Sequence, residues 1–154
     1  MWAGLEAETM PAVSAIRLLV LLAILVVALF DVAVGVRLLA SRRPYLAHGG
    51  RGPWAERTPP LWSGQSEVLL RSLYRRIGAF SLHTGVVTAV WAWVARDDAG
   101  WLTVLLVTYT ITGLAFFAND RAFFRGTRYF AVKQVLGALW AAALVGQLWV
   151  WRHG

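Results

Sequence analysis

The chain has 154 residues, a formal net charge of +7, a pI of about 11.0 and a mean hydropathy of +0.58. The mean hydropathy is far above that of an average soluble domain. A chain of this length that is mostly apolar leaves no room for a soluble domain of useful size. The absence of cysteine excludes a disulfide framework, a thiolate metal site and a cysteine nucleophile. The basic residues gather in loops, so we attribute the positive charge to membrane topology and expect no nucleic-acid binding.

Four apolar stretches predict four membrane spans, over residues 18–36, 77–95, 101–118 and 135–151. Each approaches the roughly 20 residues that cross a hydrocarbon core about 30 Å thick. Glu6 and Glu8 make the N-terminus acidic, where a cleavable signal is basic, so we expect the first span to be retained. The predicted fold is all-α: an integral membrane four-helix bundle in a single domain over residues 1–154.

Between the first two spans lies the longest predicted loop, residues 41–66, which is basic and rich in proline and glycine. Ser66 is a candidate N-cap for a helix that enters the second span. Asp97 and Asp98 predict a tight turn and helix caps before the third span. After that span we expect a second basic loop over residues 119–133.

Charge and aromatic residues predict the same orientation. Most of the 15 basic residues flank the two predicted loops, and only Arg17, Arg96 and Arg152 flank the other ends of the spans. The positive-inside rule then makes loops 41–66 and 119–133 cytoplasmic and both termini non-cytoplasmic, in a bacterial-type cytoplasmic membrane. Five tryptophans gather at the opposite end, as an interfacial aromatic belt would: Trp91, Trp93, Trp101, Trp149 and Trp151.

Two ionisable residues fall inside the predicted spans. Asp31 lies six residues before Arg37, and His83 lies seven residues after Arg76. Because the two spans are antiparallel, both groups sit about 9–10 Å inside the same end at 1.5 Å per residue. Thr112 falls near this layer, and Tyr109 lies one turn deeper. Since a charged group in hydrocarbon usually faces the bundle interior with a partner, we predict a polar layer of Asp31, His83, Tyr109 and Thr112.

This layer has three interpretations. In the first, Asp31 and His83 fix the register of two helices by binding each other, or Asp31 instead reaches Arg37 or the interface. In the second, the four residues form a pocket that binds a lipophilic small molecule or a lipid, or that relays a proton. Alternatively, Asp31 and His83 are the catalytic acid and base of an intramembrane enzyme acting on a lipid or isoprenoid. No G-x-S-x-G, P-loop or H-E-x-x-H motif is present, so the question of catalysis stays open and we favour a non-catalytic role.

Small residues at helical spacing predict the packing faces, because they let transmembrane helices approach closely. The faces are Ala28, Asp31 and Gly35 in the first span; Gly78, Ser81, Gly85, Thr88 and Ala92 in the second; Thr108, Thr112, Ala115 and Asn119 in the third; and Gln134, Ala138, Ala142 and Gly146 in the fourth. We expect these faces to make the helix–helix contacts.

A cofactor pattern occurs once. Ala79 and His83 form A-x-x-x-H, which resembles the bacteriochlorophyll-binding pattern of light-harvesting polypeptides, and the small Ala79 leaves room for a macrocycle over the imidazole. The four-span layout does not match a one-span antenna subunit, and no second intramembrane histidine exists for a bis-histidine haem. With His83 as the one candidate we predict no cofactor, and the histidine spacing predicts no metal site.

Further features lie in the second half of the chain. Arg76-Ile77-Gly78 is followed one heptad later by Gly85, then by a short turn, and Asp120-Arg121 and Gly126 follow the third span. In these features the region from Leu73 onwards resembles the DoxX-like families of small four-span membrane proteins, although Gln134 stands where an acidic residue would open the last span. The resemblance implies a four-helix fold and little about activity.

The favoured function is that of an accessory or scaffold subunit that packs against a larger membrane protein. Small-residue faces, many aromatic residues and a basic loop favour this role, and no catalytic motif opposes it. The expected partners are membrane lipids and either a membrane protein or a second copy of the chain.

Overall fold

The computed structural model describes residues 3–41, 64–126 and 128–153, which form four helices. They are α1 (Ala3–Ala40), α3 (Gly64–Val94), α4 (Ala99–Phe124) and α5 (Arg128–His153). Each contains a candidate span, long and apolar enough to cross a membrane: Ala12–Ala40, Arg71–Val94, Ala99–Ala118 and Arg128–His153. The prediction of an all-α fold with four such helices is confirmed. The predicted loop falls mostly on residues 42–63, which lie outside the described residues.

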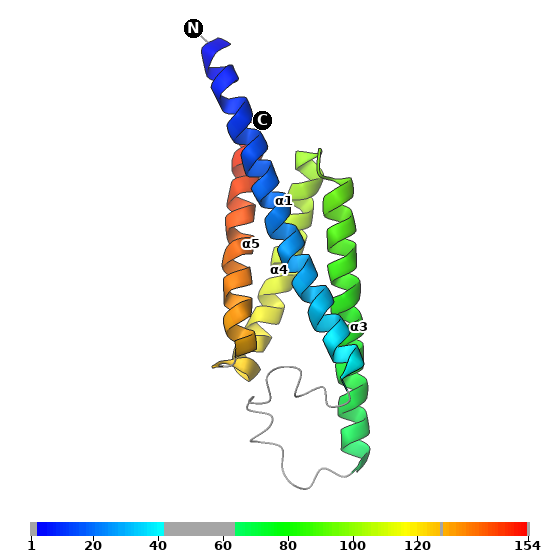
Figure 1. The fold of residues 1–154 in the computed structure, drawn as a ribbon. Helices are drawn as coiled ribbons and strands as arrows, with labels where there is room; N and C mark the ends of the chain where they lie inside the picture. The colour runs from blue at the N-terminus through cyan, green and yellow to red at the C-terminus, as the bar shows by residue number, and fades with distance from the viewer. Residues whose placement is uncertain (1–2, 42–63, 127, 154) are drawn as a thin grey trace.

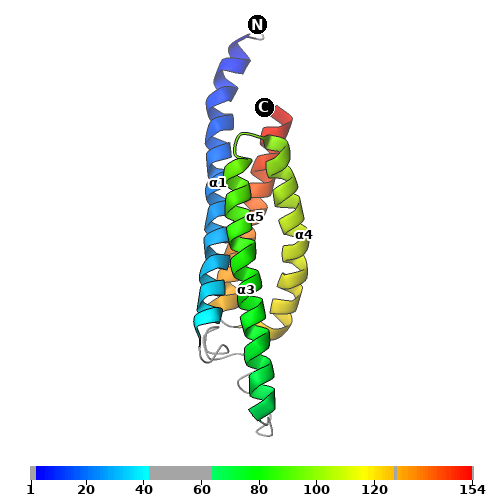
Figure 2. The same ribbon diagram turned by 90° about the vertical axis from the view of Figure 1, so that its right-hand side faces the viewer.

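The helices form an elongated bundle that α1 crosses diagonally, from α5 near its start to α3 near its end (Figure 1). In the perpendicular view α1 and α4 lie on opposite sides, with α3 and α5 between them (Figure 2). We call the end where α1 begins and α5 ends the terminal end. The opposite end, where α1 ends, α3 begins and α4 joins α5, is the loop end.

Three helices extend beyond the predicted spans into predicted loops: α3, α4 and α5, the last of which begins at Arg128. α3 begins at Gly64, so Ser66 lies inside its first turn instead of capping it. α4 continues to Phe124, because a helix satisfies its own backbone hydrogen bonds and needs no apolar side chains to continue. Arg121 in the last turn of α4 also interacts favourably with the helix dipole. Gly126, with a φ of 85°, lies in the short connection that replaces the predicted loop 119–133.

The turn between α3 and α4 forms where it was predicted. Asp98 is the N-cap of α4, and its Oδ1 accepts a hydrogen bond from the backbone N–H of Trp101 at 3.0 Å. Arg96 forms an ion pair with Asp97 at 3.4 Å, in which both side chains are exposed. The prediction that the two aspartates serve as caps is therefore confirmed for Asp98.

α1 and α3 approach so closely that their backbones touch. A Cβ added at Gly35 would lie 2.5 Å from the backbone nitrogen of Leu82, and one added at Gly85 would lie 2.6 Å from the carbonyl oxygen of Ala28. Real Cβ atoms do not approach backbone atoms this closely. The predicted packing faces of the first two spans are confirmed, since only glycine permits this contact.

The predicted packing faces of the last two spans are wrong for most of their residues. Thr108, Thr112 and Ala115 on α4 and Gln134, Ala138 and Ala142 on α5 are exposed. The side chain of Asn119 lies outside the described residues, and among the described members of these two faces Gly146 alone packs inward, against Ile16 and Val20 of α1. α4 and α5 instead meet through larger side chains such as Trp140, which fill the space between the helix axes, so no small-residue contact forms there.

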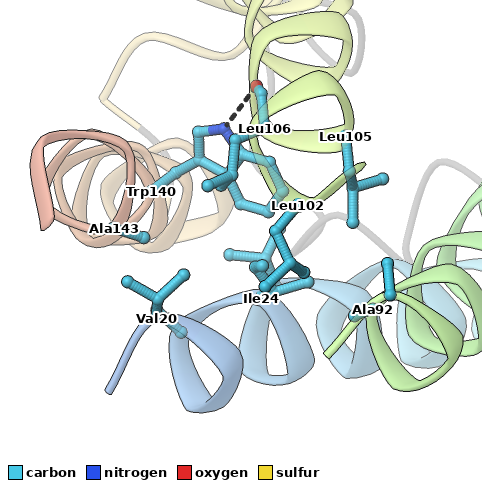
Figure 3. Close-up of a cluster of buried hydrophobic side chains, with 11 residues drawn as sticks. Val20, Ile24, Ala92, Leu102, Leu105, Leu106, Trp140 and Ala143 are labelled. Carbon is cyan, nitrogen blue, oxygen red and sulfur yellow. Dashed lines mark hydrogen bonds between the residues drawn. The ribbon is translucent and has the colours of Figure 1, made fainter. Parts of the chain in front are cut away.

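The apolar core lies in the half of the bundle near the terminal end, and all four helices contribute to it (Figure 3). It contains Val20, Ala23, Ile24 and Val27 of α1, Ala92 and Ala95 of α3, Leu102, Leu105 and Leu106 of α4, and Trp140 and Ala143 of α5. Outside this core the helices are largely uncovered, and no more than a third of the most apolar window in each candidate span is buried. So much exposed apolar surface requires lipid or protein to cover it.

Candidate functional site

Asp31 on α1 is held by α4. The hydroxyl of Tyr109 donates a hydrogen bond to its carboxylate, and the contact is partly buried. The Tyr109 ring packs on Trp140 of α5 with a centroid separation of 4.4 Å. Trp140 in turn donates from Nε1 to the hydroxyl oxygen of Thr110 at 3.0 Å. Asp31 and Tyr109, two members of the predicted polar layer, therefore lie together.

A second carboxylate near the loop end has a cationic partner. Lys133 of α5 forms an ion pair with Asp120 of α4 at 2.5 Å, and their side chains are 24% and 8% exposed. The Lys133 ammonium lies 5.3 Å from the centroid of the Tyr129 ring and interacts electrostatically with Asp31. The sequence analysis missed this pair. One feature of the sequence could have drawn attention to the pair: Lys133 is the single lysine in a chain whose other positively charged side chains are all arginine.

These contacts define a charge cluster of Asp31, Tyr109, Asp120, Tyr129 and Lys133, contributed by α1, α4 and α5. The ammonium of Lys133 pairs with Asp120, and the phenol of Tyr109 donates a hydrogen bond to Asp31. The cluster ties three helices together in one register. Helix α3, which carries His83, contributes no residue to it.

His83 and Thr112 lie elsewhere. His83 is exposed on α3, and at 100° per residue it points about 200° away from Gly85, which faces α1. It is therefore turned away from Asp31. The hydroxyl of Thr112 is exposed and donates to the carbonyl oxygen of Thr108 in its own helix at 3.1 Å. The structure thus separates the four predicted site residues into a pair, Asp31 with Tyr109, and two isolated groups.

The surface of the bundle has a hollow at each end, and neither hollow contains the predicted site residues. A hollow of about 480 Å³ lies at the loop end, and one of about 370 Å³ lies at the terminal end beside Trp91 and Trp101. Neither is lined by Asp31 or His83. Within the described part of the chain, no three His, Asp or Glu side chains come close enough to hold a metal ion.

No family model, curated protein or solved structure matches the chain. The resemblance to the DoxX-like families stays a prediction. Any functional conclusion therefore rests on the geometry of the described residues.

Replacing Tyr109 by Phe should lower the free energy of unfolding by about 1–3 kcal/mol, because the Asp31 carboxylate loses its hydrogen-bond donor in a partly buried position. Asp31→Asn keeps an acceptor oxygen and should cost less. The double variant should be more stable than the sum of the single losses implies, because the two residues act as a pair. Unfolding of the detergent-purified protein, followed by circular dichroism, measures all three. Additive losses would contradict the pairing.

Proposed function

We propose that the chain is a multi-pass protein of the cytoplasmic membrane, with segments 41–66 and 119–133 on the cytoplasmic side and both termini on the other side. Exposed apolar surface on all four helices supports the membrane location. The orientation is supported by basic residues at the loop end and by tryptophans at the terminal end, where the rings of Trp91 and Trp101 lie 6.1 Å apart.

Within that membrane, the proposed role is that of a non-catalytic accessory or scaffold subunit of a larger membrane system. The observation that carries this role is the exposure of His83 inside the candidate span of α3. Counted along the helix, His83 is about 10 Å from Arg76 and about 20 Å from Arg96, at hydrocarbon depth. An ionisable side chain that faces lipid is costly, so a polar group from another protein is expected to meet it.

The surface around His83 fits a partner helix. Phe80 lies one turn before it, and Val86 and Val90 follow at helical spacing; these side chains are 50%, 47% and 57% exposed. Transmembrane helices associate through van der Waals packing supplemented by interhelical hydrogen bonds. This face of α3 offers an apolar surface with one hydrogen-bonding group, the combination that such an association uses.

The two alternatives receive less support. A lipophilic-ligand binder and an intramembrane acid–base enzyme both need Asp31 and His83 to act together. Asp31 is instead bonded to Tyr109, and His83 is turned away from it. The charge cluster is explained by its contacts between helices, so it does not require a ligand.

Purification of the tagged chain in a gentle detergent, followed by mass spectrometry, tests the proposed role. We expect one stoichiometric membrane protein to copurify with the wild-type chain. His83→Leu should reduce its amount roughly fivefold, because an interhelical hydrogen bond contributes about 1 kcal/mol. Thr112→Val is the matched control, since its hydroxyl is exposed but bonded within its own helix, and it should change nothing.

Two outcomes would contradict the accessory role. A chain that purifies alone or as a homo-oligomer has no larger partner. Undiminished copurification with His83→Leu would show that the partner docks elsewhere, and the observation on which the proposal rests would then be irrelevant.

A further inference from the structure

At the loop end, α3 projects beyond the helix that it packs against. At Gly78 an added Cβ would lie 2.8 Å from Cβ of Leu38, two residues before α1 ends at Ala40. The first turns of α3, which begins at Gly64, extend past this end of α1 (Figures 1 and 2). The candidate span of α3 begins at Arg71, so this overhang crosses the boundary between polar and apolar sequence.

The hollow of about 480 Å³ lies where the overhang leaves the end of α1. Its lining is one stripe of α3 closed by one residue of α1: Val68, Arg71, Ser72, Arg75, Arg76 and Ala79, with Leu39. The α3 residues recur at intervals of three and four, which places them on one helix face. Basic and hydroxyl groups thus share the hollow with aliphatic side chains.

The three arginines that line the hollow differ in whether they already have an interaction partner. Arg71 already has an interaction partner. Arg75 and Arg76 are exposed, and neither forms an ion pair with any residue that the structure describes. Among the side chains that the structure describes, no aspartate or glutamate lines the hollow. Two guanidinium groups without an ion-pair partner among the described residues, beside a serine hydroxyl, supply hydrogen-bond donors of the kind that bind phosphate.

We propose that this hollow binds the headgroup of an anionic phospholipid, with Arg75 and Arg76 on the phosphate and Leu39 and Ala79 against the start of the acyl chains. Charge complementarity and the position at the polar boundary of the span identify this ligand, because a lipid presents phosphate and hydrocarbon at that boundary. The inference rests on the proposed membrane location, which resistance to carbonate extraction tests separately. It does not depend on the partner protein.

Titration of the detergent-purified full chain with dioctanoyl phosphatidylglycerol tests the site. Binding to the wild-type chain should exceed that of dioctanoyl phosphatidylcholine. The double variant Arg75→Gln/Arg76→Gln should bind phosphatidylglycerol at least roughly tenfold more weakly, since hydrogen bonds between charged groups are lost. Arg121→Gln/Arg125→Gln is the matched control: it removes the same charge from exposed positions at the same end of the bundle, outside the hollow.

Ala79→Phe provides a test that leaves every charge in place. Its ring should occupy the hollow and weaken phosphatidylglycerol binding, while Ala141→Phe, on an exposed position of α5, should not. Equal weakening in the two arginine variants would show diffuse surface attraction and overturn the proposal, as would unchanged binding in Ala79→Phe. Displacement of the lipid by glycerol 3-phosphate would assign the site to a free phosphate ester and would also overturn it.

Discussion

Alanine at Gly35 or Gly85 should force α1 and α3 apart. Each added methyl group would meet backbone atoms of the facing helix at 2.5–2.8 Å, and a backbone cannot rotate away as a flexible side chain can. Overpacking of this kind costs roughly 1–3 kcal/mol at each position. Because the two sites share one interface, Gly35→Ala/Gly85→Ala should lower the free energy of unfolding more than any other pair of small substitutions in the bundle.

Gly113 and Gly137 provide the matched control. A Cβ at either position would have no neighbour within 4 Å, although both glycines are helical. Alanine there should raise the free energy of unfolding by about 0.5–1 kcal/mol, because the unfolded chain loses conformational freedom. Thermal and denaturant unfolding in detergent compare the two pairs of variants. A similar effect of the same sign in both pairs would contradict the close contact of α1 with α3.

Lys133→Met should be the most destabilising change in the charge cluster. It leaves the Asp120 carboxylate, whose side chain is only 8% exposed, without its counter-ion. Removing one partner of a buried ion pair costs about 3–5 kcal/mol, most of it from the uncompensated charge that remains. The loss should appear in denaturant unfolding at neutral pH.

The explanation can be checked by removing the second charge as well. Asp120→Leu/Lys133→Met should recover most of the stability, because an apolar pair leaves no buried charge unpaired. Arg96→Gln is the exposed comparison, since it breaks the Arg96–Asp97 pair, whose side chains are 44% and 86% exposed, and should cost no more than about 1 kcal/mol. If the double variant were no more stable than Lys133→Met, Asp120 would not be the source of the loss.

The number of helices was predictable because hydrophobic length is read directly from the sequence. Each candidate span includes one predicted stretch almost completely, and the cap at Asp98 follows from its place before an apolar run. The helix ends near Gly64 and Phe124 were not predictable from hydropathy. A helix can continue in water on backbone hydrogen bonds alone, and hydropathy does not report this.

The depth of the candidate site residues along their helices was predictable, but the direction in which their side chains point was not. Asp31 and His83 are equally far from their span ends, yet their pairing also depends on which way each helix face turns. Gly85 shows which face of α3 packs against α1. His83 lies two residues earlier, about 200° around the helix, so its side chain is on the face that points away from α1. The ion pair of Lys133 was missed because Lys133 was counted only among the basic residues that set the membrane orientation. Its place next to the fourth apolar span could have suggested a carboxylate partner.

The diagonal course of α1 has a consequence for the order of assembly. α1 is synthesised first, and its contact with α3 can form as soon as the second helix is made. The start of α1, including Ile16 and Val20, is covered only when α5, the last helix, arrives, because these residues lie against Gly146. α3 and α4 follow each other in the chain but share little contact. Contacts between the helices therefore follow the order α3, α1, α5 and α4, and the arrival of α5 joins α4 to the pair of α1 and α3.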